Sequence, residues 1–255
     1  MNGRPAPPYH TLFTGGFSPS MVIVQWEESL PPLAGELQTA VDAAWEGLNP
    51  NPHFNGRIAR LEEWRIRDGA LHLWLRPVEY KHLLYSNAHT GEIIRHYGEH
   101  QLARALGISA VVVSAEGQIL LMERSDRVGE FPGCYDLFGG HIDPPAQGEI
   151  PDPFASMEKE LDEELALLPG TASLSLFGLL LTREARKPEL LFIARCGMES
   201  EAMMRAALGA RDRYEYRRLL AIPADAESVR GFLQRHRTKL SPSAFGGLEI
   251  FAAMR

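Results

Sequence analysis

Apolar and polar positions alternate along several segments of the chain, and this period of two predicts β-strands. Leucines at positions 71, 73 and 75 are separated by single residues, and residues 57–67 precede them across an Asp68-Gly69 pair. An Asp-Gly pair between two such runs is typical of a tight hairpin turn. Further strands are expected over residues 21–27, 110–113, 118–122, 174–181 and 190–194, the second and third of these forming a hairpin around Glu116-Gly117.

Other segments have the three-to-four-residue spacing of amphipathic helices. Leu37, Val41, Ala44 and Leu48 fall on one side of a helix predicted over residues 33–48, which ends at the turn-rich run Asn49-Pro50-Asn51-Pro52. Shorter helices are predicted over residues 99–106, 199–208, 225–235 and 241–254. Ser241 is a suitable N-cap for the last helix and Pro242 suits its first position, whereas Gly246-Gly247 disfavour helix within it.

A glycine pair followed by an acidic helix is the most informative motif. The strand-like run at residues 135–138 leads into Gly139-Gly140, and a helix is predicted around Glu160, Glu163 and Glu164. These glutamates stand at i, i+3 and i+4, so their carboxylates share one helix face and repel one another unless a cation intervenes. Hard oxygen ligands of this kind suit Mg²⁺ or Mn²⁺. An acidic run alone is more often a solvated face, but the order strand, glycine loop, acidic helix favours a metal site.

A separate apolar stripe, formed by Leu161, Leu165 and Leu168, is expected to turn the same helix toward the core.

These residues together resemble the signature box of the Nudix hydrolases. In that resemblance Gly140 is the opening glycine, Glu149 the first glutamate, Lys159 the position of the box arginine, and Glu160, Glu163 and Glu164 the metal-binding glutamates. The implied fold is α+β, a Nudix α/β/α sandwich with a mixed sheet. We expect residues 99–255 to form this domain and residues 1–98 to form a β-rich extension, which the resemblance implies would help to bind the nucleotide.

Three departures from the box are visible. The stretch from Gly140 to Lys159 is five residues longer than usual and contains prolines, which an exposed loop tolerates. Lys159 lacks the planar fork with which arginine holds a carboxylate. Ala166 replaces a glycine, and Pro169-Gly170 are expected to stop the helix one turn later.

The wider chain resembles one branch of the family, the animal Nudix-type pyrophosphatases of UDP-glucose and UDP-galactose. The matching positions are Phe54, Arg60, residues 80–87, Arg124-Ser125, residues 128–133, Gly139-Gly140-His141, Glu189 and Ser243. The resemblance implies Mg²⁺-dependent cleavage of a UDP-hexose into UMP and hexose 1-phosphate. Other Nudix substrates, namely ADP-ribose, coenzyme A and dinucleoside polyphosphates, remain alternatives, as does a non-catalytic nucleotide sensor.

The candidate site residues follow from this interpretation. Glu160, Glu163 and Glu164 are the expected catalytic residues, and the same three with the Gly140 carbonyl are the expected metal ligands. Glu160 is also a candidate for orienting or deprotonating the attacking water, with metal ligation alone as the alternative.

The expected substrate-binding residues are Tyr80, Asn87, Arg124, Arg127 and Glu189, and Tyr85 is a further candidate for stacking on a base. Solvent-exposed loop arginines, a surface glutamate and packed tyrosines are the alternative interpretations. His141 is expected either to touch phosphate or to pack.

Composition narrows the remaining possibilities. The 255 residues carry a net charge of −7, which argues against a general nucleic-acid surface and makes an anionic substrate depend on local arginines and a bound metal. Neither a signal pattern at the N-terminus nor an apolar run of about 20 residues is present, so we expect a cytoplasmic protein without membrane contact. Cys134 and Cys196 are too few for a disulfide framework. A small-molecule nucleotide diphosphate is the expected partner, and the sequence does not define an oligomeric state.

Overall fold

The computed structural model describes residues 6–48, 55–146 and 149–255. A large sheet has the strand order β1-β9-β10-β5-β6-β11, with β7 paired to β6 and β8 paired to β5. Its strands are β1 (Tyr9–Phe17), β5 (Gly107–Val113), β6 (Gln118–Arg124), β7 (Tyr135–Asp136), β8 (Phe138–His141), β9 (Ala172–Thr182), β10 (Pro188–Cys196) and β11 (Tyr216–Pro223). The sheet is mixed, because β10 runs parallel to β5 while β9, β6 and β8 pair antiparallel to their neighbours.

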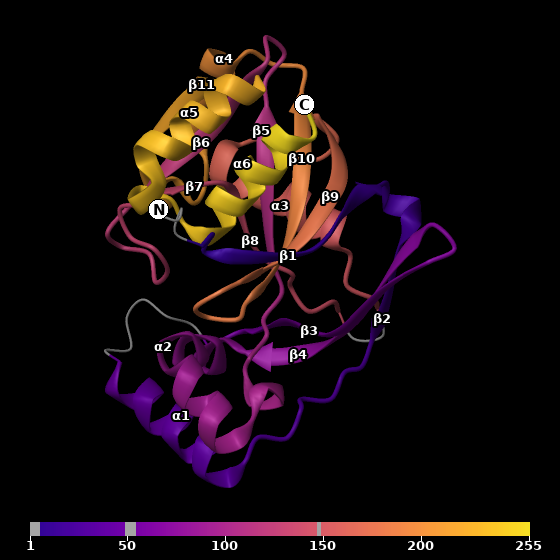
Figure 1. Ribbon diagram of the computed structural model, residues 1–255, viewed down its shortest axis with the longest axis vertical. Helices are drawn as coiled ribbons and strands as arrows, with labels where there is room; N and C mark the ends of the chain where they lie inside the picture. The colour runs from indigo at the N-terminus through magenta and orange to yellow at the C-terminus, as the bar shows by residue number, and fades with distance from the viewer. Residues whose placement is uncertain (1–5, 49–54, 147–148) are drawn as a thin grey trace, which may run out of the picture.

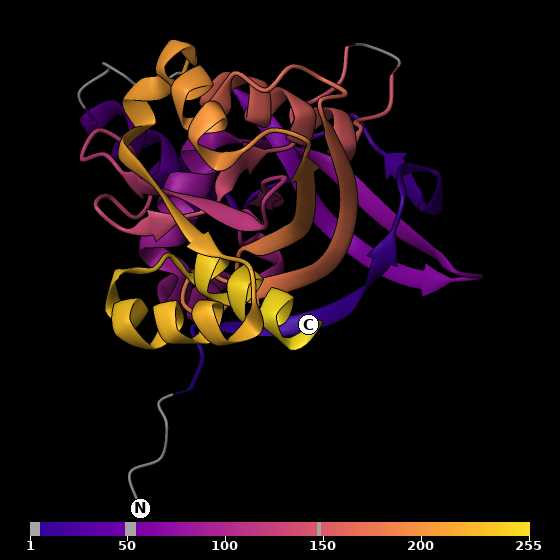
Figure 2. The same cartoon turned by 90° about the horizontal axis from the view of Figure 1, so that it is seen from above.

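Helices cover both faces of the large sheet, as expected for an α/β/α sandwich. Helix α3 (Pro153–Leu165) shares one apolar cluster with β5, β9 and β10. Helices α5 (Ala226–His236) and α6 (Pro242–Ala253) share a second cluster with the opposite face. In Figures 1 and 2, α5 and α6 lie on one side of the strands and α3 on the other. The predicted α+β class with a mixed sheet is therefore confirmed.

A smaller unit formed by the N-terminal part of the chain lies below the large sheet in Figure 1. It contains the sheet β2-β4-β3, made of β2 (Val22–Trp26), β3 (Arg57–Arg67) and β4 (Ala70–Glu79), with helices α1 (Gly35–Gly47) and α2 (Tyr80–Tyr97). The β3–β4 hairpin is the predicted one. Asp68 and Gly69 have φ angles of 52° and 77°, the positive values that a two-residue turn of this kind requires.

The two sheets share a core. The alternating leucines of β4 point into the same apolar cluster as α3 and the large sheet. Backbone hydrogen bonds also join them, from Ala59 to Ile142 (2.9 Å) and from Leu106 to Ala59 (2.8 Å). Strand β1 pairs with β9 rather than with the smaller sheet. The domain boundary between residues 98 and 99 stays a prediction, and it does not coincide with a break in this core.

One sequence expectation was wrong in the connecting region, and one helix there was not predicted. The helix predicted over residues 99–106 is a single 3₁₀ turn, Glu99–Gln101, because the apolar residues that follow are buried in extended backbone and Arg104 has a φ of 47°. Helix α2 was not predicted, since its buried face includes His82, Ser86 and Thr90 rather than a clean apolar stripe. Strands β1 and β11 were also missed.

Helix α6 forms despite its two glycines, and Ser241 caps it by accepting a hydrogen bond from the Ala244 amide (3.1 Å). A Cβ at Gly246 would overlap Leu180, and one at Gly247 would overlap Leu137, so the glycines let the helix lie directly on the sheet. Asn49-Pro50-Asn51-Pro52 and Phe54 lie outside the described residues. Across the three described ranges, every helix falls short of the length and apolar character of a membrane span.

Candidate active site

A cavity of about 390 Å³ opens where the end of β8 meets α3 and the smaller unit. Its size lies within the range of small-molecule sites. Strand β8 contributes Gly139, Gly140 and His141, helix α3 contributes Glu160 and Glu163, and the smaller unit contributes Ile58 and Tyr80. Loop residues 127–131 and 212–215 close the sides. The glycine pair and the acidic helix of the sequence motif therefore meet at one pocket.

Helix α3 is held in place by its ends and its apolar face. Asp152 caps the first turn by accepting a hydrogen bond from the Phe154 amide (2.8 Å), and Pro153 occupies the first helical position. Leu161 and Leu165 are buried, as predicted, but Leu168 is 65% exposed. The expected extra turn is absent because Ala166 adopts the left-handed conformation (φ 55°, ψ 35°) and ends the helix itself.

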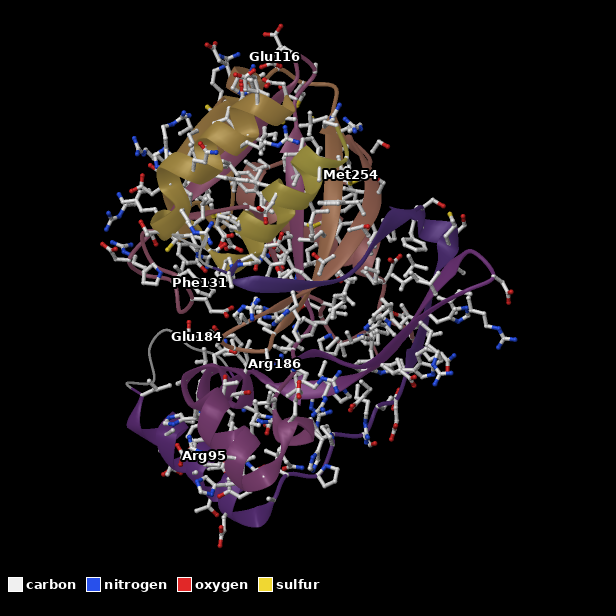
Figure 3. All side chains as sticks on the ribbon, in the orientation of Figure 1. Arg95, Glu116, Phe131, Glu184, Arg186 and Met254 are labelled. Carbon is white, nitrogen blue, oxygen red and sulfur yellow. The ribbon has the colours of Figure 1, made fainter. Side chains whose placement is uncertain are left out.

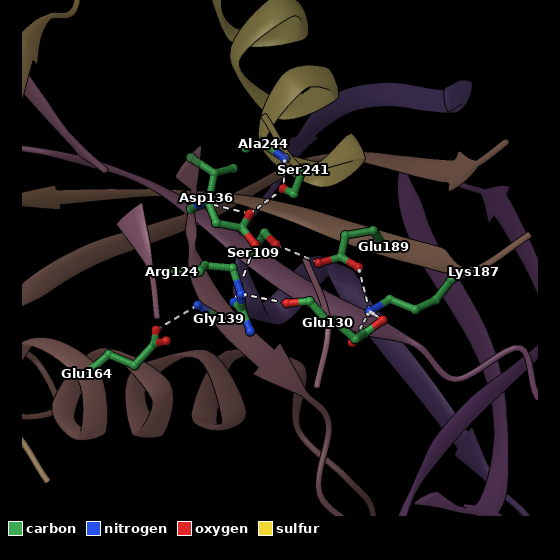
Figure 4. A network of polar contacts seen from close by, with 11 residues as sticks. Ser109, Arg124, Glu130, Asp136, Gly139, Glu164, Lys187, Glu189, Ser241 and Ala244 are labelled. Atoms are coloured by element: carbon green, nitrogen blue, oxygen red, sulfur yellow. Dashed lines mark hydrogen bonds and ion pairs between the residues drawn. The ribbon is translucent and has the colours of Figure 1, made fainter. Parts of the chain in front are cut away.

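Glu164 lies behind the pocket wall. Its side chain is almost fully buried, and one carboxylate oxygen accepts a hydrogen bond from the Gly139 amide at 2.8 Å (Figure 4). The other oxygen, Oε1, is buried and has no hydrogen-bond partner within the described residues. Burial, reinforced by the nearby charge of Glu160, raises the pKa of Glu164 well above its usual value.

Glu160 lies against the glycine pair on the pocket side. A Cβ at residue 140 would overlap the Glu160 carboxylate, so the absence of a side chain at Gly140 gives that carboxylate its place. Burial and the charge of Glu163 raise the pKa of Glu160 to about 8. Two carboxylates with raised pKa values thus flank one glycine strand.

Glu163 is engaged by basic side chains. It lies 2.6 Å from the Arg211 guanidinium and 3.8 Å from the Lys159 ammonium, and Lys159 also pairs with Asp143 in the lengthened loop. In the parts of the chain that the structure describes, no cluster of three Cys, His, Asp or Glu side chains is tight enough to hold a metal ion. For Glu163 to bind the same cation as Glu160 and Glu164, its ion pair with Arg211 would have to break.

The chemistry of these residues nevertheless fits a divalent cation. Carboxylate oxygens are the ligands that Mg²⁺ and Mn²⁺ prefer, and a bound cation would lower the raised pKa values of Glu160 and Glu164. The buried Glu164 Oε1 atom gains a partner only from a cation, a proton donor or water.

The predicted substrate-binding residues divide into two groups. Tyr80, Arg124, Arg127 and Glu189 line the pocket. Asn87 does not line it and instead donates a hydrogen bond to Glu130 Oε1 (2.9 Å) from helix α2.

Several other sequence candidates lie away from the cavity or within packed structure. Tyr85 stacks on His89 with ring centroids 4.2 Å apart and packs between α1 and α2. Glu149 is exposed and is not among the pocket-lining residues. Arg60 is almost fully buried and pairs with Glu62 (3.1 Å).

A buried polar network in the pocket lining contains the predicted Glu189, whereas its partners Ser109, Glu130 and Lys187 were missed by sequence reasoning. Lys187 lies 3.0 Å from Glu130 and 3.8 Å from Glu189, and Ser109 donates a hydrogen bond to Glu189 at 2.5 Å (Figure 4). Glu130 is partly desolvated, but Lys187 holds its pKa at about 2, whereas burial raises the pKa of Glu189 to about 7. These residues come from separate strands and a loop, so their spacing in the sequence carried no signal.

Two further acidic residues line the pocket. Burial raises the pKa of Asp136, which accepts hydrogen bonds from Ser241 (2.5 Å) and the Leu137 amide (2.9 Å) and pairs with Arg124 (3.3 Å). Glu215 lies in the loop before β11, and burial raises its pKa as well. The sequence places Glu215 about 50 residues beyond the acidic helix, so only the fold reveals it as a neighbour.

Fold and site together define an enzyme of the α+β class with a carboxylate-lined pocket at the edge of a mixed sheet. The chain is similar to Nudix hydrolase 9 of Arabidopsis thaliana, with 26% identity over 279 residues, covering 94% of this chain and 88% of that protein. It is also similar to the uridine diphosphate glucose pyrophosphatase NUDT22 of Bos taurus, with 26% identity over 197 residues, covering 65% and 68% of the two chains. No family model matches the chain.

Solved structures give weaker likenesses. A mutT/nudix family protein from Listeria innocua aligns with 59% of this chain and 91% of its own, at 18% identity and a TM-score of 0.40. The NUDIX domain of NrtR from Shewanella oneidensis, in complex with ADP ribose, aligns with 65% and 97%, also at 18% identity and a TM-score of 0.40.

The box residues and the two sequence relatives agree in indicating a Nudix hydrolase. Cleavage of a diphosphate linkage is the reaction of that family, so the protein is a hydrolase.

Proposed function

We propose that this chain hydrolyses the diphosphate of a nucleotide sugar, UDP-glucose or UDP-galactose, to UMP and hexose 1-phosphate, with Mg²⁺ or Mn²⁺ as cofactor. The observation that carries the proposal is that two carboxylates lie against the Gly139-Gly140 strand. Glu164 accepts a hydrogen bond from the Gly139 amide, and the Glu160 carboxylate occupies the space that a side chain at Gly140 would fill. The likeness to a UDP-glucose pyrophosphatase supports the choice of sugar nucleotide.

The roles of the residues follow from where they lie. Glu160, Glu163 and Glu164, with the Gly140 carbonyl, would hold the cation, which when bound neutralises phosphate charge and lowers the pKa of a water molecule. Glu160 lines the pocket, so it would orient or deprotonate the attacking water, with ligation of the cation as the alternative role. Arg124 and Arg127 line the same pocket and offer guanidinium groups to phosphate oxygens.

The remaining parts of the proposal concern nucleotide binding and the location of the protein in the cell. Tyr80 offers an aromatic face from the smaller unit, which would give residues 1–98 a part in nucleotide binding. A cytoplasmic location is supported by the free thiols of Cys134 and Cys196.

The test is a panel of diphosphates incubated with purified protein and Mg²⁺, followed by chromatography of the products. We expect UMP from UDP-glucose or UDP-galactose, no product after addition of a chelator, and much weaker cleavage of ADP-ribose, coenzyme A and dinucleoside polyphosphates. Preferential cleavage of ADP-ribose would replace the proposed substrate while leaving the chemistry intact. Absence of hydrolysis of every diphosphate would refute the catalytic assignment.

Replacing Glu164 by Gln is expected to lower kcat/KM about 100-fold or more, because it removes a negatively charged ligand of the proposed cation. Asp162→Asn is the matched control, since Asp162 is an acidic residue of the same helix that lies off the face shared by Glu160, Glu163 and Glu164. Equal activity of the two variants would remove Glu164 from the proposed site.

A further inference from the structure

Glu189 and His141 lie at the same level of the sheet, on the two strands that flank β5. Glu189 on β10 is in register with Gly107 on β5, and Gly107 is in register with His141 on β8. Successive residues of a strand face opposite sides of the sheet. Gly140, the residue before His141, therefore faces the other side, where the Glu160 carboxylate lies. The pocket therefore has two walls of different composition, the proposed metal wall at α3 and a second wall containing Ser109, His141 and Glu189, which we call the hydroxyl wall.

The hydroxyl wall carries two buried polar atoms without hydrogen-bond partners among the described residues, Glu189 Oε2 and His141 Nε2. Glu189 is only 3% exposed, and its other oxygen is already bonded to Ser109 (2.5 Å). Buried polar atoms are almost always paired in native proteins. Two such atoms in residues that line one cavity therefore leave hydrogen-bonding capacity that polar groups of a ligand would satisfy.

The backbone makes room for this carboxylate. A Cβ at residue 107 would overlap both oxygens of Glu189, so Gly107 provides the space in which the carboxylate lies. Ser109, two residues further along β5, then fixes one oxygen and leaves Oε2 for another donor. The second wall is thus organised around Glu189.

The charges of the surroundings specify what kind of ligand group fits. Lys187 pairs with Glu130 at 3.0 Å and is 3.8 Å from Glu189 Oε2, so two carboxylates face one ammonium. The diphosphate diester of the substrate carries no proton at neutral pH, so the ionised Glu130 and the ionised form of Glu189 would repel it here. A hydroxyl group can donate to Glu189 Oε2 and can also accept from or donate to the imidazole nitrogen of His141.

We propose that Ser109, His141 and Glu189 form a subsite for the hydroxyl groups of a sugar ring of the substrate, with Glu189 as the specificity-determining residue. This inference rests on the proposed hydrolysis of a nucleotide sugar. The ring is either the hexose or the ribose of that substrate, because both present neighbouring hydroxyl groups.

The experiment compares kcat/KM for UDP-glucose with that for analogues lacking one hydroxyl each, at positions 2, 3, 4 and 6 of the hexose or at position 2′ of the ribose. We expect the wild-type protein to discriminate against at least one analogue by about 10-fold or more, because a buried site built for a hydroxyl is left unpaired without it. In Glu189→Gln that ratio is expected to fall below about 3-fold. The position of the sensitive hydroxyl tells hexose from ribose.

A readout independent of turnover accompanies the kinetics. Saturation-transfer NMR with UDP-glucose in the presence of a chelator is expected to show weaker transfer to the protons of the same ring in Glu189→Gln than in the wild type. Glu184→Gln is the matched control, because Glu184 is an exposed residue in the turn before the same strand and does not line the pocket (Figure 3).

Each outcome decides the proposal. Loss of discrimination in Glu189→Gln but not in Glu184→Gln supports it. An unchanged ratio, with all rates lowered together, overturns it and leaves Glu189 a structural residue, as does a wild type that treats every deoxy analogue like UDP-glucose. In those cases the proposed hydrolysis of UDP-glucose still stands. A protein that cleaves no nucleotide sugar overturns the proposed function and this inference with it.

Discussion

At the scale of single residues, the site depends on glycines as much as on carboxylates. Gly140 makes room for the Glu160 carboxylate on the α3 side of the sheet, and Gly107 makes room for Glu189 on the other. A methyl side chain at residue 140 or 107 would displace the carboxylate of Glu160 or of Glu189, respectively. The glycine pair of the motif thus has a steric function beyond forming a turn.

Gly140→Ala is expected to lower kcat/KM roughly 100-fold, since a new Cβ overlaps the Glu160 carboxylate and moves it from the reacting groups. Steady-state kinetics with UDP-glucose and Mg²⁺ measure the effect. Gly16→Ala in β1 is the control, because a Cβ there meets nothing within 4 Å. A fully active Gly140→Ala protein would show that the position of Glu160 against Gly140 is not needed for the reaction.

At the scale of elements, the acidic helix ends in an unfavourable conformation. Ala166 has the left-handed φ of 55° that costs an ordinary residue energy, at a position where glycine is preferred. The helix is nevertheless positioned by Asp152 at its start and by Leu161 and Leu165 against the core. Its C-terminal cap is therefore a place where stability can be added without touching the pocket.

Ala166→Gly is expected to raise the free energy of unfolding by about 1 kcal/mol, because glycine adopts the left-handed conformation without steric cost. Urea denaturation measures the change. Ala155→Gly, on the exposed side of the same helix, is expected to do the opposite by a similar amount. Destabilisation by both variants would contradict the assignment of Ala166 as a strained cap.

Helix α2 carries a buried titratable group. The ring nitrogen Nε2 of His82 is 3.0 Å from the Gln101 carbonyl, and burial lowers the His82 pKa from 6.5 to about 4. Because the folded-state pKa is the lower one, the stability that His82 contributes is full above about pH 6.5 and is lost as the pH falls toward 4.

The difference in unfolding free energy between wild type and His82→Asn should therefore change by roughly 2.5 kcal/mol from about pH 7 to about pH 4.5. Asparagine keeps a donor for the Gln101 carbonyl but does not titrate in this range. Denaturation curves of both proteins at each pH give the difference. Parallel pH profiles for the two proteins would show that His82 is not the group responsible.

At the scale of the whole molecule, Glu130 connects the smaller unit to the large sheet. It accepts a hydrogen bond from Asn87 on α2 (2.9 Å) and pairs with Lys187, the residue just before β10 (3.0 Å), while its backbone carbonyl accepts from Arg124 (3.0 Å). The turn between β9 and β10 adds a second link, because Arg186 pairs with Glu99 at 2.7 Å (Figure 3). The pocket is lined by residues of both parts, so the contacts of Glu130 and Arg186 fix its two sides relative to one another.

Glu130→Gln is expected to lower the free energy of unfolding by about 3 kcal/mol, because the buried Lys187 ammonium loses its closest carboxylate. The double variant Glu130→Gln, Lys187→Met should be less destabilised than the single one, since no uncompensated charge remains. Urea denaturation of the three proteins checks this order. If the double variant is at least as unstable as the single one, the loss of stability in Glu130→Gln does not come from the unpaired charge of Lys187.

The sequence by itself determined the elements with strong local signals. The β3–β4 hairpin follows from alternating leucines around Asp68-Gly69, and α6 begins at Ser241 because a serine cap and a proline are local features. The placement of Glu160, Glu163 and Glu164 on one helix was also predictable, since helix geometry follows from local spacing, whereas their role as metal ligands stays a prediction. Turns, caps and helix faces depend on a few neighbouring residues, so the sequence alone predicts them.

Only the tertiary structure decided the rest. Glu130, Lys187, Ser109 and Glu189 come from a loop and two strands and meet only when β5 and β10 pair. Helix α2 and the 3₁₀ turn at residues 99–101 were misread, because long-range packing buries His82 and Leu102 regardless of local pattern. Desolvation and strand pairing are properties of the folded chain, so the chemistry of the second pocket wall appears only after the fold has brought its residues together.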